Sequence, residues 1–207
     1  MCDKKIILIG YSGHGFVVAD TALENQLNII GYTERAISSS NPFHLDYLGN
    51  ESDSDFLGWG MEVDFLIGLG DNSLREKIFK LVSSRGKKVC TLIHASSSIS
   101  SFSEIGIGVF VNRNVSINAF AKIGNNVLLN TGCIIEHECI IGDSVHIAPG
   151  AVLAGNVEVG DRTFIGANSV IKQGVKIGKD VTVGAGSVVL ENIPSGKRLV
   201  GNPTRFI

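Results

Sequence analysis

The feature that most constrains this chain is a six-residue repeat that runs from Ile93 to Val189. Every sixth residue in this stretch is Ile, Leu or Val, and from Ile99 onward a small or β-branched residue follows four positions later. Neither an α-helix nor an alternating strand produces strict sixes. The repeat therefore predicts a hexapeptide β-helix, in which three hexads close one triangular coil around the repeating side chains.

The corners of such a coil require backbone freedom, and the residue after the aliphatic position is often glycine or asparagine. Both residue types tolerate positive φ, so we expect positive φ at these positions. They are Gly106, Gly124, Gly142, Gly160, Gly166, Gly178, Gly184, Asn112, Asn118 and Asn130. An antiparallel sandwich with regular turns would have no reason to keep this spacing.

Composition agrees with a narrow aliphatic interior and excludes several classes of partner. Hydrophobic residues make up 44% of the 207 residues, but aromatic residues only 7%, because large rings do not fit inside a small coil. The formal net charge is −2 and no basic run stands out, which argues against a nucleic-acid partner. The apolar run Ile6–Ile9 is far too short for a signal peptide, and no stretch approaches transmembrane length. We expect a cytoplasmic protein without membrane insertion.

The first ninety residues have a different sequence pattern, in which apolar runs typical of buried strands alternate with segments of helical spacing. This pattern predicts a small α/β domain with a parallel sheet and a glycine-rich first turn. We expect strands over 5–10, 28–32, 63–68 and 87–92, and helices over 16–27 and 74–82, the second capped near Asp71. Residues 35–61 are expected to be mostly loop. The predicted domains are therefore 1–90, the β-helix over 91–193, and a tail over 194–207 that covers the open end of the coil.

The first candidate site is the loop that contains Gly10, Gly13 and Gly15. It joins a strand to the start of a helix, where backbone N–H groups and the helix dipole favour an anion. The order G-x-x-G-x-G differs from the dinucleotide fingerprint G-x-G-x-x-G, which disfavours a redox dinucleotide. A phosphate-bearing ligand is the preferred interpretation, and a tight turn without a ligand is the alternative.

The second candidate site is the sequence Glu136-His137-Glu138. In the hexad register Ile135 and Cys139 point inward, so His137 should face outward near a corner. A carboxylate beside an imidazole can hold its tautomer and make it a general base, although a lone surface histidine is usually inert. His146 is either a binding donor or an incidental surface residue.

Metal binding and covalent catalysis have less support in the sequence. His137 and His146 lie nine residues apart with no third histidine nearby in the repeat, so we expect no metal site within one chain. Cys133 and Cys139 occupy inward positions and should fill the core as thiols.

Several motifs together resemble the sugar O-acyltransferases of the sialic-acid O-acetyltransferase type, a family that includes N-acetyltransferases of nucleotide-linked amino sugars. The resemblance covers nearly the whole chain. It rests on Gly10–Gly15, Gly68–Asn72 with Arg75, Leu129–Asp143, His146–Ala151, Ala154–Gly155 and Gly201–Arg205.

The resemblance implies a Rossmann-like α/β domain that holds a sugar nucleotide, followed by a left-handed parallel β-helix. It also implies a homotrimer with active sites between subunits and acetyl-CoA as co-substrate. The implied catalytic residues are His137 as general base and Glu138 as its partner. The implied acetyl-CoA-binding residues are His146, Ala167 and Ala185, and the implied substrate-binding residues are Ser12, Gly13, His14, Thr33, Glu34 and Gly70.

The expected function is thus acetyl-CoA-dependent N-acetylation of a UDP- or GDP-linked 4-amino-deoxy sugar for bacterial surface glycans. O-acetylation of a sialic acid or related sugar is one alternative. A non-catalytic trimeric scaffold that binds nucleotide sugars is another, and a metal-dependent hydratase on the same solenoid is a third.

Overall fold

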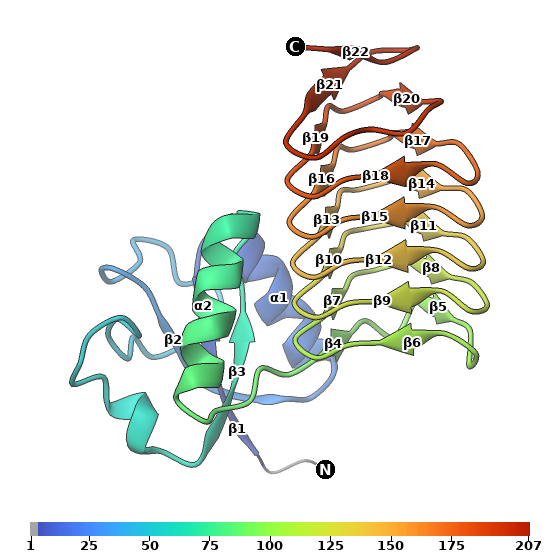
Figure 1. Cartoon of the computed structure of the whole chain (residues 1–207). Coiled ribbons are helices and arrows are strands. Elements are labelled where there is room, and N and C mark those ends of the chain that lie inside the picture. The colour runs from blue at the N-terminus through green and yellow to red at the C-terminus, as the bar shows by residue number, and fades with distance from the viewer. Residues whose placement is uncertain (1–3) are drawn as a thin grey trace. The chain divides into compact units, whose positions relative to one another are not determined.

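The computed structural model describes residues 4–207, which form two compact units that meet between Leu92 and Ile93. The first unit contains β1 (Lys5–Ile9), α1 (Gly13–Glu24), β2 (Asn28–Thr33), η1 (Leu57–Gly60), β3 (Val63–Ile67) and α2 (Asn72–Ser84). The second unit is a stack of short strands that ends in β21 (Arg198–Val200) and β22 (Arg205–Phe206) (Figure 1).

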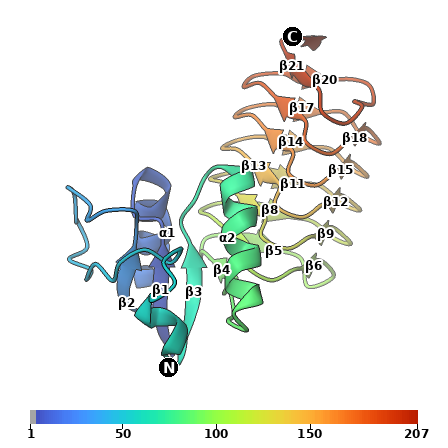
Figure 2. The same ribbon diagram turned by 60° about the vertical axis from the view of Figure 1, so that its left-hand side comes forward.

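The first unit is a three-stranded parallel sheet in the order β2-β1-β3, with α1 and α2 on opposite faces (Figure 2). Alternate side chains of β1 pack toward each helix, so that Ile7 and Ile9 join Ile78 and Val82 of α2 in one core. Asp71 caps α2 as expected, because its side chain accepts a hydrogen bond from the backbone N–H of Leu74 at 2.8 Å. The parallel order places the carboxyl ends of all three strands at one edge of the sheet.

Two expectations for this unit were wrong in detail. The first helix begins at Gly13 rather than Phe16, directly after the glycine loop. The predicted strand over 87–92 does not form in the sheet. Val89 makes only an isolated bridge to Phe65, and the next strand, β4 (Leu92–Ile93), spans the boundary between the units and pairs in the eight-stranded sheet of the solenoid.

The second unit is a left-handed parallel β-helix; the repeat predicts the β-helix, and the family resemblance implies its left-handed sense. Strands 18 residues apart pair in parallel, for example Leu128 with His146. We name the three faces after their middle strands. The β13 face contains β4 (Leu92–Ile93), β7 (Phe110–Val111), β10 (Leu128–Leu129), β13 (His146–Ile147), β16 (Phe164–Ile165) and β19 (Thr182–Val183). The β11 face contains β5 (Ser98–Ile99), β8 (Ser116–Ile117), β11 (Ile134–Ile135), β14 (Val152–Leu153), β17 (Val170–Ile171) and β20 (Val188–Val189). The β12 face contains β6 (Glu104–Ile105), β9 (Lys122–Ile123), β12 (Ile140–Ile141), β15 (Glu158–Val159) and β18 (Lys176–Ile177).

The interior of the coil is the ladder of side chains that the hexad register predicts. Ile135, Ile147 and Leu153 are fully buried, and so are the small residues Cys133 and Cys139 between them. Burying one such aliphatic side chain stabilises a fold by roughly 1.5–3 kcal/mol. At the end of the stack, β21 pairs with β19 and then with β22, and Leu199 continues the interior ladder.

The corners differ from the expectation. Positive φ occurs at every sixth residue from Gly108 to Gly186, two positions beyond the predicted ones, and includes bulky residues such as Phe120 (φ 64°) and Glu138 (φ 60°). The glycines that directly follow the aliphatic residue lack positive φ. They are needed for close approach between coils instead: a Cβ on Gly142 would lie 2.8 Å from the backbone nitrogen of Asp161 in the next coil.

Candidate active site

The glycine loop lies at the carboxyl edge of the three-stranded sheet and is shaped by close backbone approach. Gly10 has φ of 87°, a conformation that favours glycine. A Cβ on Gly15 would collide with the carbonyl oxygen of Gly10 and lie 2.9 Å from its carbonyl carbon. These constraints explain two of the three glycines without any ligand, and they bring the start of α1 tightly against the end of β1.

The predicted residues Ser12, Gly13 and His14 form the N-terminus of α1. Ser12 is the N-cap, but its side chain makes no capping hydrogen bond, and both Ser12 and Gly13 are exposed. The first helical hydrogen bond runs from the N–H of Phe16 to the carbonyl of Ser12 at 2.8 Å. The backbone N–H groups in the first turn of a helix have no partner within the helix, and such a terminus is a common binding site for phosphate.

Arg75 adds positive charge beside this turn. Arg75 is 3% exposed, and its guanidinium donates to the carbonyl of Gly70 at 3.1 Å and to Asn72 Oδ1 at 3.0 Å, so it braces the loop after β3. Burial, together with the nearby Arg75 cation, lowers the pKa of His14 from 6.5 to about 4, which keeps the imidazole neutral at pH 7. Gly70 lies next to His14, with space for a Cβ at 4.0 Å from the Cβ of His14.

The two predicted residues after β2 have structural partners in the same region. Thr33 is buried and donates through Oγ1 to Glu51 Oε2 at 2.8 Å. Glu34 accepts the backbone N–H of Tyr11 at 3.2 Å through Oε2 and that of Arg35 at 3.1 Å through Oε1. Glu34 therefore orients the glycine loop, and its carboxylate keeps further lone pairs for ligand hydroxyl groups.

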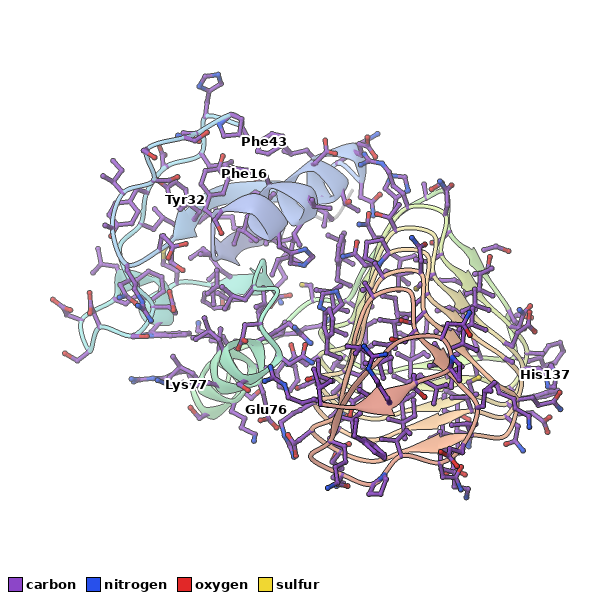
Figure 3. The ribbon with its side chains drawn as sticks, turned by 90° about the horizontal axis from the view of Figure 1, so that it is seen from above. Phe16, Tyr32, Phe43, Glu76, Lys77 and His137 are labelled. Carbon is purple, nitrogen blue, oxygen red and sulfur yellow. The ribbon has the colours of Figure 1, made fainter. Side chains whose placement is uncertain are left out.

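A pocket opens at this edge of the sheet, lined among others by Gly10, Glu34, Arg35, Glu51 and Lys77. Figure 3 shows Lys77 on α2 and the aromatic rings of Phe16, Tyr32 and Phe43 in the same unit. The structure thus brings all six predicted substrate-binding residues to one edge of one sheet. The lining residue Glu51 was absent from the predicted site, because residues 35–61 carry no recognisable pattern. Arg75 was part of the motif that carries the resemblance but was given no binding role.

His137 and Glu138 occupy the corner between the β11 face and the β12 face, and His137 projects outward there (Figure 3). Its Nδ1 lies 3.2 Å from Glu138 Oε2, and the two side chains are 51% and 62% exposed. Backbone hydrogen bonds to the neighbouring coils fix the corner. The N–H of Glu138 donates to the carbonyl of Ala119 at 3.0 Å, and the N–H of Asn156 donates to the carbonyl of His137 at 2.8 Å. The carboxylate contacts only one ring nitrogen, so Nε2 is available to accept a proton.

The same corner carries an aromatic pair that the sequence analysis missed. Phe102 and Phe120 are 69% and 60% exposed, and their ring centroids lie 5.8 Å apart. They precede Glu138 by 36 and 18 residues, two coils and one coil, so the repeat itself could have identified them.

The three residues predicted to bind acetyl-CoA lie elsewhere on the solenoid. His146 is on β13, where its ring packs edge-on against Phe164 with centroids 4.9 Å apart. Ala167 and Ala185 lie one above the other at the corner between the β13 face and the β11 face, and the N–H of Gly186 donates to Ala167 at 2.8 Å. Within one chain this group is separated from His137 by the full width of the β11 face.

Neither cysteine of the core is poised for chemistry. Cys133 and Cys139 are fully buried, and burial raises both thiol pKa values, that of Cys133 to about 12. Among residues 4–207, no cluster of three or more His, Cys, Asp or Glu side chains is arranged to hold a metal ion. Within the same range no helix has the length and apolar character needed to span a bilayer.

Comparisons with known proteins match both units. Residues 5–82 match the PglD N-terminal domain. Residues 120–155 match the bacterial transferase hexapeptide, and residues 156–191 match the hexapeptide repeat of succinyl-transferase.

Solved structures similar to the whole chain include the acetyltransferase domain of PglB from Neisseria gonorrhoeae, with 29% identity, 99% of this chain and 100% of that chain covered, and a TM-score of 0.91. GDP-perosamine N-acetyltransferase from Caulobacter crescentus is 29% identical over 100% of this chain and 98% of its own, with a TM-score of 0.93. WeeI from Acinetobacter baumannii is 27% identical over 99% of this chain and 100% of its own, with a TM-score of 0.87. The chain thus combines a match to the PglD N-terminal domain with matches to hexapeptide repeats, and it is similar over its full length to these acetyltransferase structures.

Proposed function

We propose that this protein is an acetyl-CoA-dependent N-acetyltransferase that acts on a nucleotide-linked amino sugar. The PglB domain has been solved with acetyl coenzyme A, and the Caulobacter enzyme with CoA and GDP-perosamine. The observation that carries the proposal is the outward His137–Glu138 pair in a chain similar to that enzyme over its full length. A UDP- or GDP-linked 4-amino-deoxy sugar of a bacterial surface glycan is the substrate class we infer.

We infer that the first unit holds the nucleotide sugar. A diphosphate carries two negative charges that suit the N-terminus of α1 and the cation of Arg75. In doubly wound sheets, ligands bind at the carboxyl ends of the strands, and an acidic residue after the second strand commonly accepts ribose hydroxyl groups. Glu34 has that place in the chain, directly after β2. We therefore assign the diphosphate to the turn Ser12–His14 and the ribose to the neighbourhood of Thr33 and Glu34.

In the proposed mechanism the acetyl group passes directly from acetyl-CoA to the sugar amine, and His137 is the only base required. Glu138 holds the proton on Nδ1 of His137, and Nε2 accepts a proton from the sugar amine as its nitrogen attacks the thioester carbonyl of acetyl-CoA. The C–N bond forms, and the carbonyl oxygen becomes an oxyanion that a hydrogen-bond donor stabilises. When the oxyanion collapses, the C–S bond breaks, and the proton on His137 passes to the leaving thiolate to give coenzyme A. No acyl-enzyme forms, in keeping with the inert buried thiols.

We propose a homotrimer because one chain does not assemble the predicted site. His137 lies at one edge of the β11 face, while His146, Ala167 and Ala185 lie at or beyond its other edge. The outward side chains of that face form an aliphatic stripe, which consists of Ile134, Val152, Val170 and Val188. Val170 is 42% exposed, and parallel sheets are normally covered on both faces. A second copy packed along this face would bring its own residues toward His137.

Mixing two inactive variants tests this arrangement. His137→Ala and His146→Ala are unfolded together and refolded at equal concentration, and acetyl transfer is measured against each parent alone. If each site takes one histidine from each of two neighbouring chains, every mixed trimer holds one intact site, and ~25% of wild-type activity returns. If both histidines act within one chain, no activity returns.

The substrate class is tested by a panel of UDP-, GDP- and CMP-linked amino sugars together with free sialic acid. Free thiol is measured to detect coenzyme A release, and the product is identified by mass spectrometry and treated with mild base, which removes O-acetyl but not N-acetyl groups. N-acetylated nucleotide sugar supports the proposal, and an O-acetylated product overturns it in favour of the alternative reaction. Binding of a nucleotide sugar without coenzyme A release would indicate a scaffold.

A further inference from the structure

Gly155 lies in the coil next to His137, 18 residues further along the chain. The adjacent N–H of Asn156 donates to the carbonyl of His137 at 2.8 Å, so the two coils are in tight register at this corner. Gly155 is buried, although His137 and Asn156 beside it are exposed. Something at the surface therefore covers its Cα.

The backbone at this position does not require glycine. Gly155 is not among the residues with positive φ, so an alanine would adopt its conformation without strain. Gly174 is the opposite case, because its φ is 73° and nothing lies within 4 Å of the position where its Cβ would be. The reason for glycine at position 155 must be space rather than backbone conformation.

The space is taken by the imidazole of His137. A Cβ on Gly155 would lie 2.5 Å from Nε2 and 3.1 Å from Nδ1, and it would collide with Cε1. These three ring atoms are the nearest atoms that such a Cβ would meet. The ring thus lies directly against the bare Cα of the neighbouring coil.

We propose that Gly155 is a positioning residue for His137, which rests on the proposed function and deepens it. The missing side chain creates the seat in which the imidazole lies flat. In that seat Nδ1 stays within 3.2 Å of Glu138 Oε2, and Nε2 remains available to the substrate. A methyl group at position 155 pushes the ring away by about an ångström, which is the distance between 2.5 Å and ordinary contact. The contact with Glu138, already long for a hydrogen bond, is then lost.

The kinetic test uses Gly155→Ala, with Gly60→Ala as the matched control. Gly60 also lacks positive φ, and nothing lies within 4 Å of its Cβ position, so the control should keep its activity within twofold. A displacement of about 1 Å at a reacting group can cost about 100-fold, so we expect kcat of Gly155→Ala to fall by about that factor. The KM for the nucleotide sugar should stay unchanged. A kcat within twofold of wild type would overturn the proposal.

A spectroscopic test does not depend on activity. In the wild-type protein the Hα protons of Gly155 should show a nuclear Overhauser effect to the Hε1 proton of His137, and that signal should disappear in Gly155→Ala. If His137→Ala proves fully active, the proposed base is wrong, but this measurement still decides whether Gly155 seats the ring. A signal that persists in Gly155→Ala would contradict the proposal that the His137 imidazole needs the bare Cα of Gly155.

A double-mutant cycle separates positioning from a general structural role. In the His137→Ala background there is no ring to displace, so adding Gly155→Ala should cause no further loss of thermal stability or residual activity. This holds even if Gly155→Ala alone folds poorly, because the double variant should then fold as well as His137→Ala. A loss of stability in the double variant equal to that in Gly155→Ala would show that Gly155 acts independently of His137, and would refute the inference.

Discussion

Acidification should destabilise the protein through His14, the histidine at the start of α1. Its folded-state pKa is lowered to about 4 by burial and by the nearby Arg75 cation, whereas the unfolded chain should titrate near 6.5. Between these two values the unfolded state binds more protons than the folded state. The stabilisation is therefore fully present above about pH 6.5 and is lost progressively as the pH falls toward 4.

The size of the effect follows from the two pKa values. At pH 5 most of the unfolded chains carry a proton on His14, but few of the folded ones do, and the difference amounts to about 2 kcal/mol relative to pH 7.5. If the whole chain of 207 residues unfolds cooperatively, a loss of about 2 kcal/mol lowers the melting temperature by about 4–8 °C.

The assay compares melting curves of the wild type and His14→Gln at pH 7.5 and pH 5. Glutamine stays neutral, so between pH 7.5 and pH 5 the variant should lose about 2 kcal/mol less stability than the wild type. His44→Gln, which changes an exposed histidine of the same unit, should behave like the wild type. Equal losses in the wild type and in His14→Gln would refute the reasoning, and so would an NMR titration of His14 with a midpoint near 6.5.

Three further predictions follow from the solenoid. Gly142→Ala should destabilise the protein by about 1–3 kcal/mol in urea unfolding, because its Cβ would press on the next coil, and unchanged stability would contradict the close approach between coils. Val170→Asp should dissociate the oligomer, as measured by light scattering, because it places a charge in the aliphatic stripe of the β11 face; an intact oligomer would reject that face as the interface. Alkylation at pH 8 should leave Cys133 unmodified until the protein is unfolded, since burial raises its pKa to about 12; rapid labelling of the folded protein would show that the coil opens.

The solenoid could be predicted almost residue by residue, because each hexad repeats the same geometric requirement. Ile135 and Cys139 point inward as expected, and that register alone places His137 on the outside of a corner. The reason for the recurrent glycines was predicted wrongly, since sequence spacing does not distinguish a need for positive φ from a need for close contact. Gly142 and Gly155 both lack positive φ, and only the coordinates show that backbone presses on the first and an imidazole on the second.

The first unit was predictable in outline but not in its electrostatics. The strands, the glycine loop and the Asp71 cap follow from local patterns. The buried charge of Arg75 and the approach of Glu51 to Thr33 depend on tertiary contacts between distant segments, which no local pattern encodes. The predicted strand over 87–92 failed because an apolar run alone does not reveal which sheet it will join, and the chain passes instead into the first coil at Leu92.

The most direct test of the account is the rate of coenzyme A release by His137→Ala and by the wild type, with acetyl-CoA and a saturating nucleotide-linked 4-amino-deoxy sugar. Removing a general base typically costs 10²–10⁴-fold, so we expect kcat to fall by about that factor while calorimetry shows unchanged affinity for the nucleotide sugar. A His137→Ala variant that releases coenzyme A at the wild-type rate would contradict the central claim that this imidazole deprotonates the sugar amine.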